Sequence, residues 1–428
     1  MAAGNGKVLL ISYKFPPRGR VGAKRMAKFA KYLARAGWSV HVVTVATALR
    51  DADTWSADVA EEGITIHRLP GSRAAEFLDR RYAATPAGRA CKVVQHLWRK
   101  VFPVFCGLDE AEKWGRGLIP FCEDLIGREG IRNVLSTGSP FTVNYHAVQL
   151  AKRVPGLKLI TDFRDPWTEK NLYRYPLARL GARAVRMERE VLDFGHTVTV
   201  PTKGMVGLLR ESCRNPATQF VVVTNGYDPD DAELRRHGCG PRPFRLLHPG
   251  SYTNDGALSV RTFAAAALRA LDRRPGLAGA LGVDFYGFPA APVLDRATRA
   301  RLRGILRYGG TISAQQVLRE MRESFLVLVL NGPSYSHAIA SKIFDAVHMR
   351  RPVFCIVPRG NTTEVVEKGG WGSCFDCRDA AGVADGLVAW YDRWSAQPDQ
   401  ELAVRDEDVA EFSYPSLVRQ IVEAFQEA

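Results

Sequence analysis

The sequence predicts an α/β protein built from two doubly wound domains. Near-continuous aliphatic runs alternate with helical stretches, and this rhythm restarts once along the 428 residues. Aliphatic runs without polar alternation indicate strands that are covered on both faces, as in a parallel sheet. A chain of this length is too long for one ordinary core and long enough for two domains of roughly 200 residues each.

The first series of strands predicts a domain over residues 1–205. Between its first two strands, Met26 and Leu33 recur at the spacing of a buried helical stripe, so that Lys28 and Lys31 are expected on other faces of the helix. The expected strands of this series are residues 8–12, 40–45, 157–161 and 197–201.

The second series begins after Thr202 and predicts a domain over residues 220–405. Residues 406–428 end in a helical stretch whose Leu417 and Phe425 fall at core spacing. The expected strands of the second series are residues 220–226, 244–250, 283–287, 325–330 and 352–358.

The composition favours a folded protein with an anionic partner. The formal net charge is +14, which suits nucleic acid, phosphorylated substrates or an acidic membrane surface. The first residues lack the apolar region of a signal peptide, and no apolar run approaches the about 20 residues that span a bilayer, so we expect a cytoplasmic protein. Eight cysteines indicate reduced thiols, and the Cys374/Cys377 pair lacks the further ligands of a zinc site, so no metal is expected.

A glycine-containing loop, KFPPRGRVG, joins the first strand to its helix. Gly19 and Gly22 allow backbone N–H groups to approach a ligand at the helix start, where the helix dipole favours anions, and Arg20 lies between them. An ordinary turn explains the same residues. The chain contains neither a phosphate loop of the G-x-x-x-x-G-K-[ST] type nor a G-x-G-x-x-G fingerprint, which argues against P-loop NTPases and dinucleotide dehydrogenases.

The rhythm of strands and helices breaks between residues 71 and 115. The segment CKVVQHLWRKVF predicts a basic amphipathic helix that suits the surface of an anionic membrane. A helix packed on its own domain is an equally good interpretation.

Two segments carry charged side chains where strands and helices meet. In DFRDPW, three charged residues follow a buried strand, and ligands of open α/β sheets bind beyond the carboxyl ends of the strands. In SKIFDAVHM, Lys342 and Asp345 share a helix face, where a cation suits a diphosphate and a carboxylate suits ribose hydroxyls. A solvated salt bridge is the alternative for the second pair.

Taken in order, these motifs resemble those of GT-B glycosyltransferases. The segment from Tyr335 to Gly370 is similar to the donor-binding region of the large retaining group that includes many bacterial cell-surface polysaccharide and glycan enzymes. The opening strand, loop and helix, together with DFRDPW, TNGYD and YGGTIS, resemble further motifs of that group, so the likeness covers nearly the whole chain.

The resemblance implies two Rossmann-like domains facing a cleft, the first for the acceptor and the second for the nucleotide sugar. It also implies that residues 406–428 cross back to the first domain. Asp162 would accept the acceptor's proton or orient the donor sugar, while Arg164 would bind a phosphate and Asp165 would face the substrates. Alternatively, Arg164 bridges the two aspartates and only shapes the loop. The residues expected to bind the donor are Lys342, Asp345, His337, Ser341, Gly250, Ser251 and Asn225.

The sequence departs from the family pattern at two expected site residues, one in the donor segment and one in the loop after the first strand. His337 stands where many relatives have an acidic residue eight positions before Asp345, and Arg20 stands where relatives commonly have a glycine. A histidine can hydrogen-bond a sugar hydroxyl but carries no permanent negative charge.

The expected activity is transfer of a sugar from a nucleoside diphosphate donor, in the first instance a UDP-sugar, to an acceptor hydroxyl. The resemblance implies retention of configuration and no metal or other cofactor. The acceptor would be lipid-linked if the protein contacts the inner face of the cytoplasmic membrane. The alternatives are a nucleotide-sugar-binding protein without turnover, and a basic nucleic-acid-binding protein. No recognisable nucleic-acid module is present, and no nucleic-acid partner is expected.

Overall fold

The computed structural model describes most of the chain, which divides into two compact units. The first comprises residues 1–224 and 417–428, and the second comprises residues 225–416. The described residues are 6–18, 21–47, 55–72, 107–168, 175–236, 242–250 and 255–427, with the single residues Phe77, Cys91, Val94, Leu97, Trp98, Phe102 and Tyr252. None of the helices in these described residues is long and apolar enough to cross a membrane.

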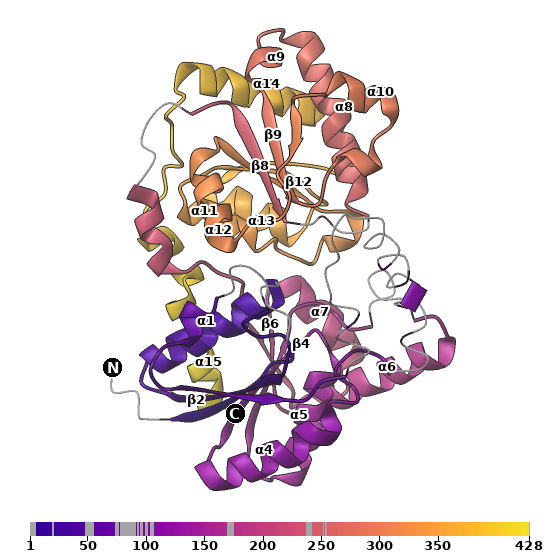
Figure 1. Ribbon diagram of the computed structural model, residues 1–428, viewed down its shortest axis with the longest axis vertical. Coiled ribbons are helices and arrows are strands. Elements are labelled where there is room, and N and C mark those ends of the chain that lie inside the picture. The colour runs from indigo at the N-terminus through magenta and orange to yellow at the C-terminus, as the bar shows by residue number, and fades with distance from the viewer. Residues whose placement is uncertain are drawn as a thin grey trace. The chain divides into compact units, whose positions relative to one another are not determined.

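A seven-stranded parallel sheet forms the centre of the first unit (Figure 1). Its strand order is β3-β2-β1-β4-β5-β6-β7. Its strands are β1 (Lys7–Ile11), β2 (Ser39–Val45), β3 (Ile64–Leu69), β4 (Asn133–Gly138), β5 (Lys158–Phe163), β6 (Thr197–Val200) and β7 (Gln219–Val222). Its helices are α1 (Val21–Arg35), α4 (Gly115–Glu129), α5 (Thr142–Arg153), α6 (Ala178–Leu192), α7 (Lys203–Ser212) and α15 (Tyr414–Glu427).

Helices cover both faces of this sheet because its strands carry aliphatic side chains on both sides. One core packs α4, α5, α6 and α7 against strand residues such as Leu9 and Val134, both 0% exposed. On α1, Met26 and Leu33 are buried as their spacing predicts. Lys28 and Lys31, expected on other faces, are buried as well, because each ammonium pairs with Asp58, at 2.7 and 3.0 Å.

Two segments that the sequence places outside the first series of strands belong to the first unit. Strand β7, which the sequence assigns to the second series, pairs in parallel with β6 and so extends the first sheet. The C-terminal helix α15 also packs here, because Leu417 and Phe425 are buried, the Phe425 ring stacks on Trp38, and Lys158 Nζ donates to the Phe425 carbonyl at 2.7 Å.

The second unit is built around a six-stranded parallel sheet in the order β10-β9-β8-β11-β12-β13. Its strands are β8 (Arg245–Gly250), β9 (Gly282–Gly287), β10 (Leu306–Tyr308), β11 (Leu326–Leu330), β12 (Val353–Ile356) and β13 (Gly372–Phe375). Its helices are α8 (Ala257–Arg273), α9 (Leu277–Ala280), α10 (Arg296–Arg301), α11 (Ala314–Glu323), α12 (Lys342–His348), α13 (Asn361–Gly369) and α14 (Ala380–Ala396).

Two apolar clusters lie on opposite faces of this second sheet. Helices α8 and α14 pack over one face, and α11, α12 and α13 pack over the other (Figure 1). The two parallel, doubly wound sheets confirm the predicted α/β fold class. Because every strand within a sheet runs in the same direction, the carboxyl ends of its strands gather at one edge, which is where open α/β sheets bind their ligands.

Candidate functional site

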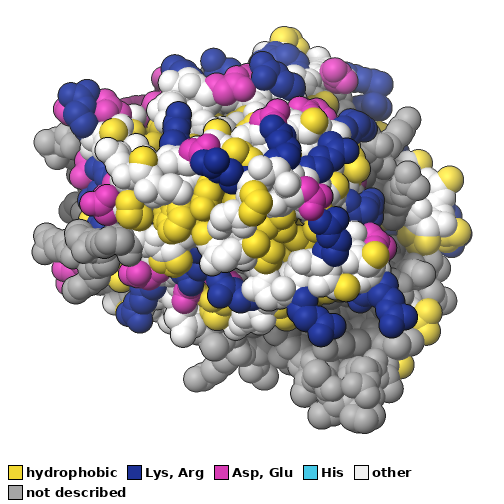
Figure 2. All heavy atoms as spheres, turned by 90° about the horizontal axis from the view of Figure 1, so that it is seen from above, with side chains coloured by type: hydrophobic (Ala, Val, Ile, Leu, Met, Phe, Trp, Pro, Cys, Tyr) yellow, Lys and Arg dark blue, Asp and Glu magenta, His cyan; other side chains and the backbone are white. Residues whose placement is uncertain are grey.

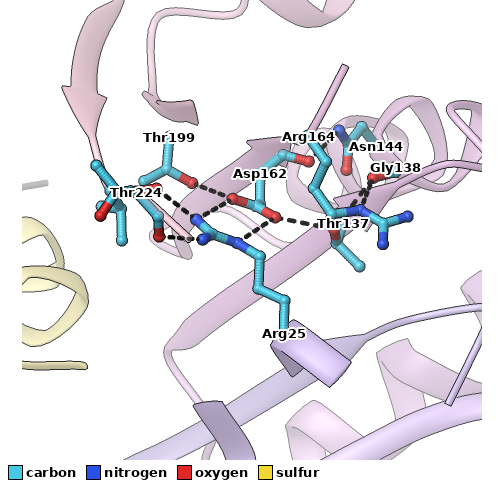
Figure 3. A network of polar contacts seen from close by, with 9 residues as sticks. Arg25, Thr137, Gly138, Asn144, Asp162, Arg164, Thr199 and Thr224 are labelled. Atoms are coloured by element: carbon cyan, nitrogen blue, oxygen red, sulfur yellow. Dashed lines mark hydrogen bonds and ion pairs between the residues drawn. The ribbon is translucent and has the colours of Figure 1, made fainter. Parts of the chain in front are cut away.

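Asp162 lies near the carboxyl end of β5 and is completely buried. Arg25 of α1 pairs with it, because Nε donates to Oδ2 at 3.2 Å and Nη2 donates to Oδ1 at 2.9 Å (Figure 3). Thr137 and Thr199, on the strands to either side, each donate a hydroxyl hydrogen bond to the carboxylate at 3.0 Å. Four hydrogen bonds occupy the acceptor positions that an ionised carboxylate offers.

This arrangement does not support the proton-accepting role expected for Asp162. Its exposed fraction is 0%, so an acceptor hydroxyl has no access to the carboxylate. The remaining N–H groups of Arg25 donate to the Thr224 and Val223 carbonyls, at 2.5 and 2.8 Å. The pair therefore connects α1 to β5 and to the residues that follow β7, and it stabilises the carboxyl edge of the sheet.

Arg164, two residues further along, packs against the start of α1. Its Nε donates to the Gly138 carbonyl at 2.6 Å and its Nη2 donates to the Ser139 carbonyl at 2.9 Å. A Cβ atom on Gly22 would lie only 2.5 Å from Nη1 of Arg164, so the absence of a side chain at Gly22 is what admits the guanidinium. Gly19 and Arg20, predicted to belong to the same loop, lie outside the described residues.

The rest of the DFRDPW loop is held by Glu188 of α6, which is 2% exposed. Its Oε1 accepts from the Trp167 and Thr168 backbone amides at 3.1 and 3.3 Å, and its Oε2 accepts from the Thr168 hydroxyl. Trp167 stacks on Phe141, with 5.7 Å between ring centroids. The loop is therefore fixed on both sides of Asp165, which is itself partly exposed.

A pair of carboxylates from the segment before α4 lies at the same edge. Asp109 accepts from the backbone amide of Thr142 at 3.0 Å and so satisfies the N-terminus of α5. Burial and the neighbouring Glu110 raise the pKa of Asp109 to about 6. Glu110 pairs with Lys14, which follows β1, at 2.7 Å, and the charge of Lys14 opposes burial so that the pKa of Glu110 is lowered.

In the second unit, Lys342 is the first residue of α12. Among the residues that the structure describes, no carboxylate lies within ion-pair distance of its ammonium and no acceptor hydrogen-bonds it. The side chain is half-buried, and loss of water around it lowers the pKa of Lys342 to about 8. Lys342 interacts electrostatically with His248 of β8 and Cys355 of β12, and the helix that it begins packs against one face of the sheet.

The segment that leads into α12 is held by the start of α13. The Asn361 amide donates to the Ser336 carbonyl at 2.9 Å, and the Thr362 hydroxyl donates to the Ala338 carbonyl at 2.9 Å. A Cβ on Gly360 would come within 2.1 Å of the Ser336 oxygen, so only glycine permits this approach. The segment is thus fixed relative to Lys342.

The other expected donor residues are spread over the second unit. His337 is 8% exposed and its ring stacks on Tyr335, with 5.9 Å between centroids. Asp345 lies one turn after Lys342 and is partly exposed, and Ser341 precedes α12 without capping it. Gly250 ends β8 with a φ of +93°, Ser251 lies outside the described residues, and Asn225 is the first residue of the second unit.

The structure thus brings the expected residues together in two groups. Gly22, Asp162, Arg164 and Asp165 gather at the carboxyl edge of the first sheet, whereas Ser341, Lys342 and Asp345 gather beside the second sheet. Arg25, Glu188 and Asp109 were missed by the sequence interpretation. Within the described parts of the chain, no group of three or more histidine, cysteine or acidic side chains is arranged to hold a metal ion.

Comparisons with known proteins agree with the fold. Residues 22–226 match the model of the glycosyl transferase 4-like domain. A search of curated protein sequences finds no significant match. Sucrose-phosphate synthase from Thermosynechococcus elongatus is similar in structure, with a TM-score of 0.63 and 16% identity over 99% of both chains.

Two further solved structures show how varied proteins of this fold are. An E. coli trehalose-6-phosphate protein bound with UDP-2-fluoro glucose has a TM-score of 0.54 and 12% identity, over 99% of this chain and 97% of that chain. A putative UDP-N-acetylglucosamine 2-epimerase from Listeria monocytogenes has a TM-score of 0.52 and 14% identity, over 99% of this chain and 98% of that one. At these identities the likeness establishes the fold alone.

Proposed function

From the premise that this chain has the GT-B fold and carries a glycosyl transferase 4-like domain over residues 22–226, we propose that it transfers a sugar from a nucleoside diphosphate to an acceptor hydroxyl. The donor is in the first instance a UDP-sugar, and the reaction retains configuration and uses no metal. The second unit binds the donor and the first binds the acceptor.

Lys342 is the observation that carries the proposal. An ammonium that has lost water and has no carboxylate partner among the described residues favours an anion beside it, because an unpaired charge in a dry site is costly. Lys342 begins the helix that follows β11, and ligands of open α/β sheets bind beyond the carboxyl ends of the strands, which supports the assignment. A diphosphate supplies the missing negative charge, and Asp345 is placed one turn away for a ribose hydroxyl.

In the first unit we assign positioning roles to most of the DFRDPW loop. Asp162 and Arg25 hold the sheet edge, and Glu188 holds the loop, so that Arg164 and the partly exposed Asp165 present their polar groups at a fixed place. Asp165 is therefore the loop residue that we propose for contact with the acceptor. We propose that the Arg164 guanidinium, whose Nε and Nη2 donate to the Gly138 and Ser139 carbonyls, contacts a phosphate of the substrate.

The positive charge favours an anionic surface near the acceptor. We propose that the enzyme is cytoplasmic and contacts the inner face of the membrane, where it would meet a lipid-linked acceptor. Val94 and Leu97, in the predicted amphipathic segment, are 54% and 57% exposed, although most of that segment lies outside the described residues. An amphipathic helix of this kind suits a lipid interface.

Nucleic-acid binding receives less support. Figure 2 shows basic and acidic side chains interspersed on one face of the molecule. Ion pairs such as Arg273–Asp385 and Arg274–Asp392 join α8 and α14 of the second unit. Paired arginines offer less charge to phosphates than the single-sign stripe typical of nucleic-acid proteins.

The proposal is tested by isothermal titration with UDP, GDP, ADP and dTDP, repeated with Lys342→Ala. We expect selective binding of one nucleotide and a loss of affinity of roughly 10- to 150-fold in the variant, which corresponds to about 1.5–3 kcal/mol for a charge-assisted contact. Lys368→Ala, which removes an exposed lysine from α13 of the same unit, is the matched control and should bind normally. If no nucleotide binds, the donor-site assignment is wrong.

His337 motivates the second candidate, a nucleotide-sugar-binding protein without turnover. Such a protein would bind the nucleotide and depend on Lys342, yet it would neither transfer nor hydrolyse the sugar across a panel of acceptors. Measuring donor hydrolysis with the nucleotide identified by titration separates this candidate from the enzyme.

A further inference from the structure

Aromatic side chains cluster at the carboxyl ends of β8, β9 and β10 in the second unit. Phe288 follows β9 directly and is 54% exposed, and Tyr308 ends β10 and is 51% exposed. Tyr252, just beyond β8, contacts Phe288 edge-on, with 6.0 Å between ring centroids. Scattered exposed apolar residues are ordinary, but here two large rings share the edge at which the fold binds ligands.

Hydrogen bonds fix the tips of the three strands to one another. The Tyr252 hydroxyl donates to the Pro289 carbonyl at 3.1 Å, and the Tyr308 hydroxyl donates to the Gly287 carbonyl at 3.2 Å. The Gly287 amide donates to the Gly310 carbonyl at 2.7 Å. These hydrogen bonds hold the backbone at Gly287 and Pro289, on either side of Phe288, while the Phe288 ring itself is exposed to solvent.

Ring contacts run from Phe288 through Tyr252 to His248 of β8. The Tyr252 ring lies 6.0 Å from Phe288 and 6.5 Å from His248, and His248 is the residue of β8 that interacts with the Lys342 ammonium. In the sheet, β8 lies between β11 and β9, the strand that Phe288 follows. The exposed Phe288 ring thus follows the strand next to β8, whose His248 interacts electrostatically with the Lys342 ammonium.

We propose that Phe288 stacks on the base of the nucleotide whose diphosphate Lys342 binds. The inference rests on the proposed function and adds to it a residue that recognises the base. A nucleoside diphosphate is an anion at one end and a flat aromatic ring at the other, and this unit offers a cation after β11, at Lys342, and an exposed ring after β9, at Phe288. An unsubstituted phenyl ring reads the face of a base and not its hydrogen-bonding edge, so Phe288 contributes affinity for every base.

Titration of Phe288→Ala with the preferred nucleoside diphosphate and with inorganic pyrophosphate tests this inference. We expect affinity for the nucleotide to fall on the order of 10-fold and at most about 100-fold, the range of one base-stacking contact. Pyrophosphate, which has no base, should bind the variant and the wild type equally. Phe288→Tyr keeps the aromatic face and should restore nucleotide binding.

The control is Val185→Ala, which removes an exposed apolar side chain (38% exposed) from α6 of the first unit and should change nothing. Unchanged nucleotide affinity in Phe288→Ala, or failure of Phe288→Tyr to restore it, would overturn the role of Phe288 while leaving the donor site intact. An equal loss of pyrophosphate binding would show that the variant damages the site as a whole and would also overturn it. If the wild type binds no nucleotide, the proposed function fails and the inference fails with it.

Discussion

Arg25 and Asp162 form a buried ion pair that joins α1 to β5 across 137 positions of sequence. Their side chains are 3% and 0% exposed, and every acceptor position of the carboxylate is used within the protein. A charge in such a place is tolerated only while its partner is present, since an unpaired buried charge is costly. Asp162, near the carboxyl end of β5, therefore has a structural role, because it joins β5 to α1 and to the two neighbouring strands.

The first prediction concerns this pair. Arg25→Ala should lower the free energy of unfolding by about 3–5 kcal/mol, because it leaves the Asp162 carboxylate buried without its cation. The double variant Arg25→Met/Asp162→Leu should lose much less than the two single variants summed. Chemical denaturation followed by circular dichroism measures these differences.

Arg153→Ala provides the comparison, because its pair with Glu123 is exposed on both sides and should be worth about 0–1 kcal/mol. A cost for Arg25→Ala no larger than that of Arg153→Ala would contradict the structural role assigned to the pair.

The contact of Gly22 with Arg164 gives a second prediction. Gly22→Ala places a methyl group against a guanidinium held by two carbonyls, so we expect a loss of about 1–3 kcal/mol and a fall in turnover. Nucleotide affinity should not change, because Lys342 lies in the other unit. Denaturation, turnover and titration check the three parts separately.

Gly127→Ala in α4 is the matched control. Apart from its chain neighbours and the backbone of α4 itself, no described atom lies within 4 Å of the position that the added methyl group would take, so the substitution should stabilise the helix by roughly 0.5–1 kcal/mol. Adding Arg164→Ala to Gly22→Ala removes the collision, and a double variant no more stable than Gly22→Ala alone would show that the collision is not the cause.

A third prediction concerns Glu188, which holds the loop after β5. Glu188→Ala removes the acceptor of the Trp167 and Thr168 amides, so these amides should exchange hydrogen faster and turnover should fall. Glu190→Ala, on the same helix, removes an exposed carboxylate that pairs with Lys152, and it should leave both quantities unchanged. Slow exchange at Trp167 in Glu188→Ala would mean that other contacts hold the loop.

The sequence pattern was sufficient to predict the parallel sheets, because a strand that is buried on both faces appears in the sequence as an unbroken aliphatic run. Strand β7 has the same pattern, yet it belongs to the first sheet, since the pattern does not say which neighbour a strand pairs with. The parallel, doubly wound class was therefore predictable, whereas the membership of one strand was not.

The polar residues show the limit more clearly. Arg25 sits among basic residues of α1 whose periodicity predicts exposure, but Lys28 and Lys31 are buried through Asp58 and Arg25 through Asp162. These partners lie on other elements, and a helix pattern contains no information about them. The same holds for Glu188, whose role depends on a loop that precedes it by 20 residues or more.

The last prediction follows from the lowered pKa of Lys342, which is about 8. Nucleotide binding needs the ammonium, so the affinity of the wild type should decline as the pH rises above about 8. Lys342→Arg keeps its charge throughout, because a guanidinium loses its proton only far above this range, and its affinity should stay flat to about pH 10. Titrations at intervals between pH 6.5 and pH 10 (roughly half-unit steps) compare the two.

The free energy of unfolding should rise with pH above about 8, whereas the affinity for nucleotide should fall. Lys342 titrates at about 8 in the folded chain and near 10.5 when unfolded, so between these values the unfolded state binds more protons. In the absence of nucleotide, the contribution of Lys342 should therefore raise the free energy of unfolding as the pH rises from about 8 to about 10.5, and Lys342→Met should abolish that contribution. An affinity that is independent of pH in the wild type would mean that the ammonium is solvated and paired, contrary to the unpartnered cation on which the donor site depends.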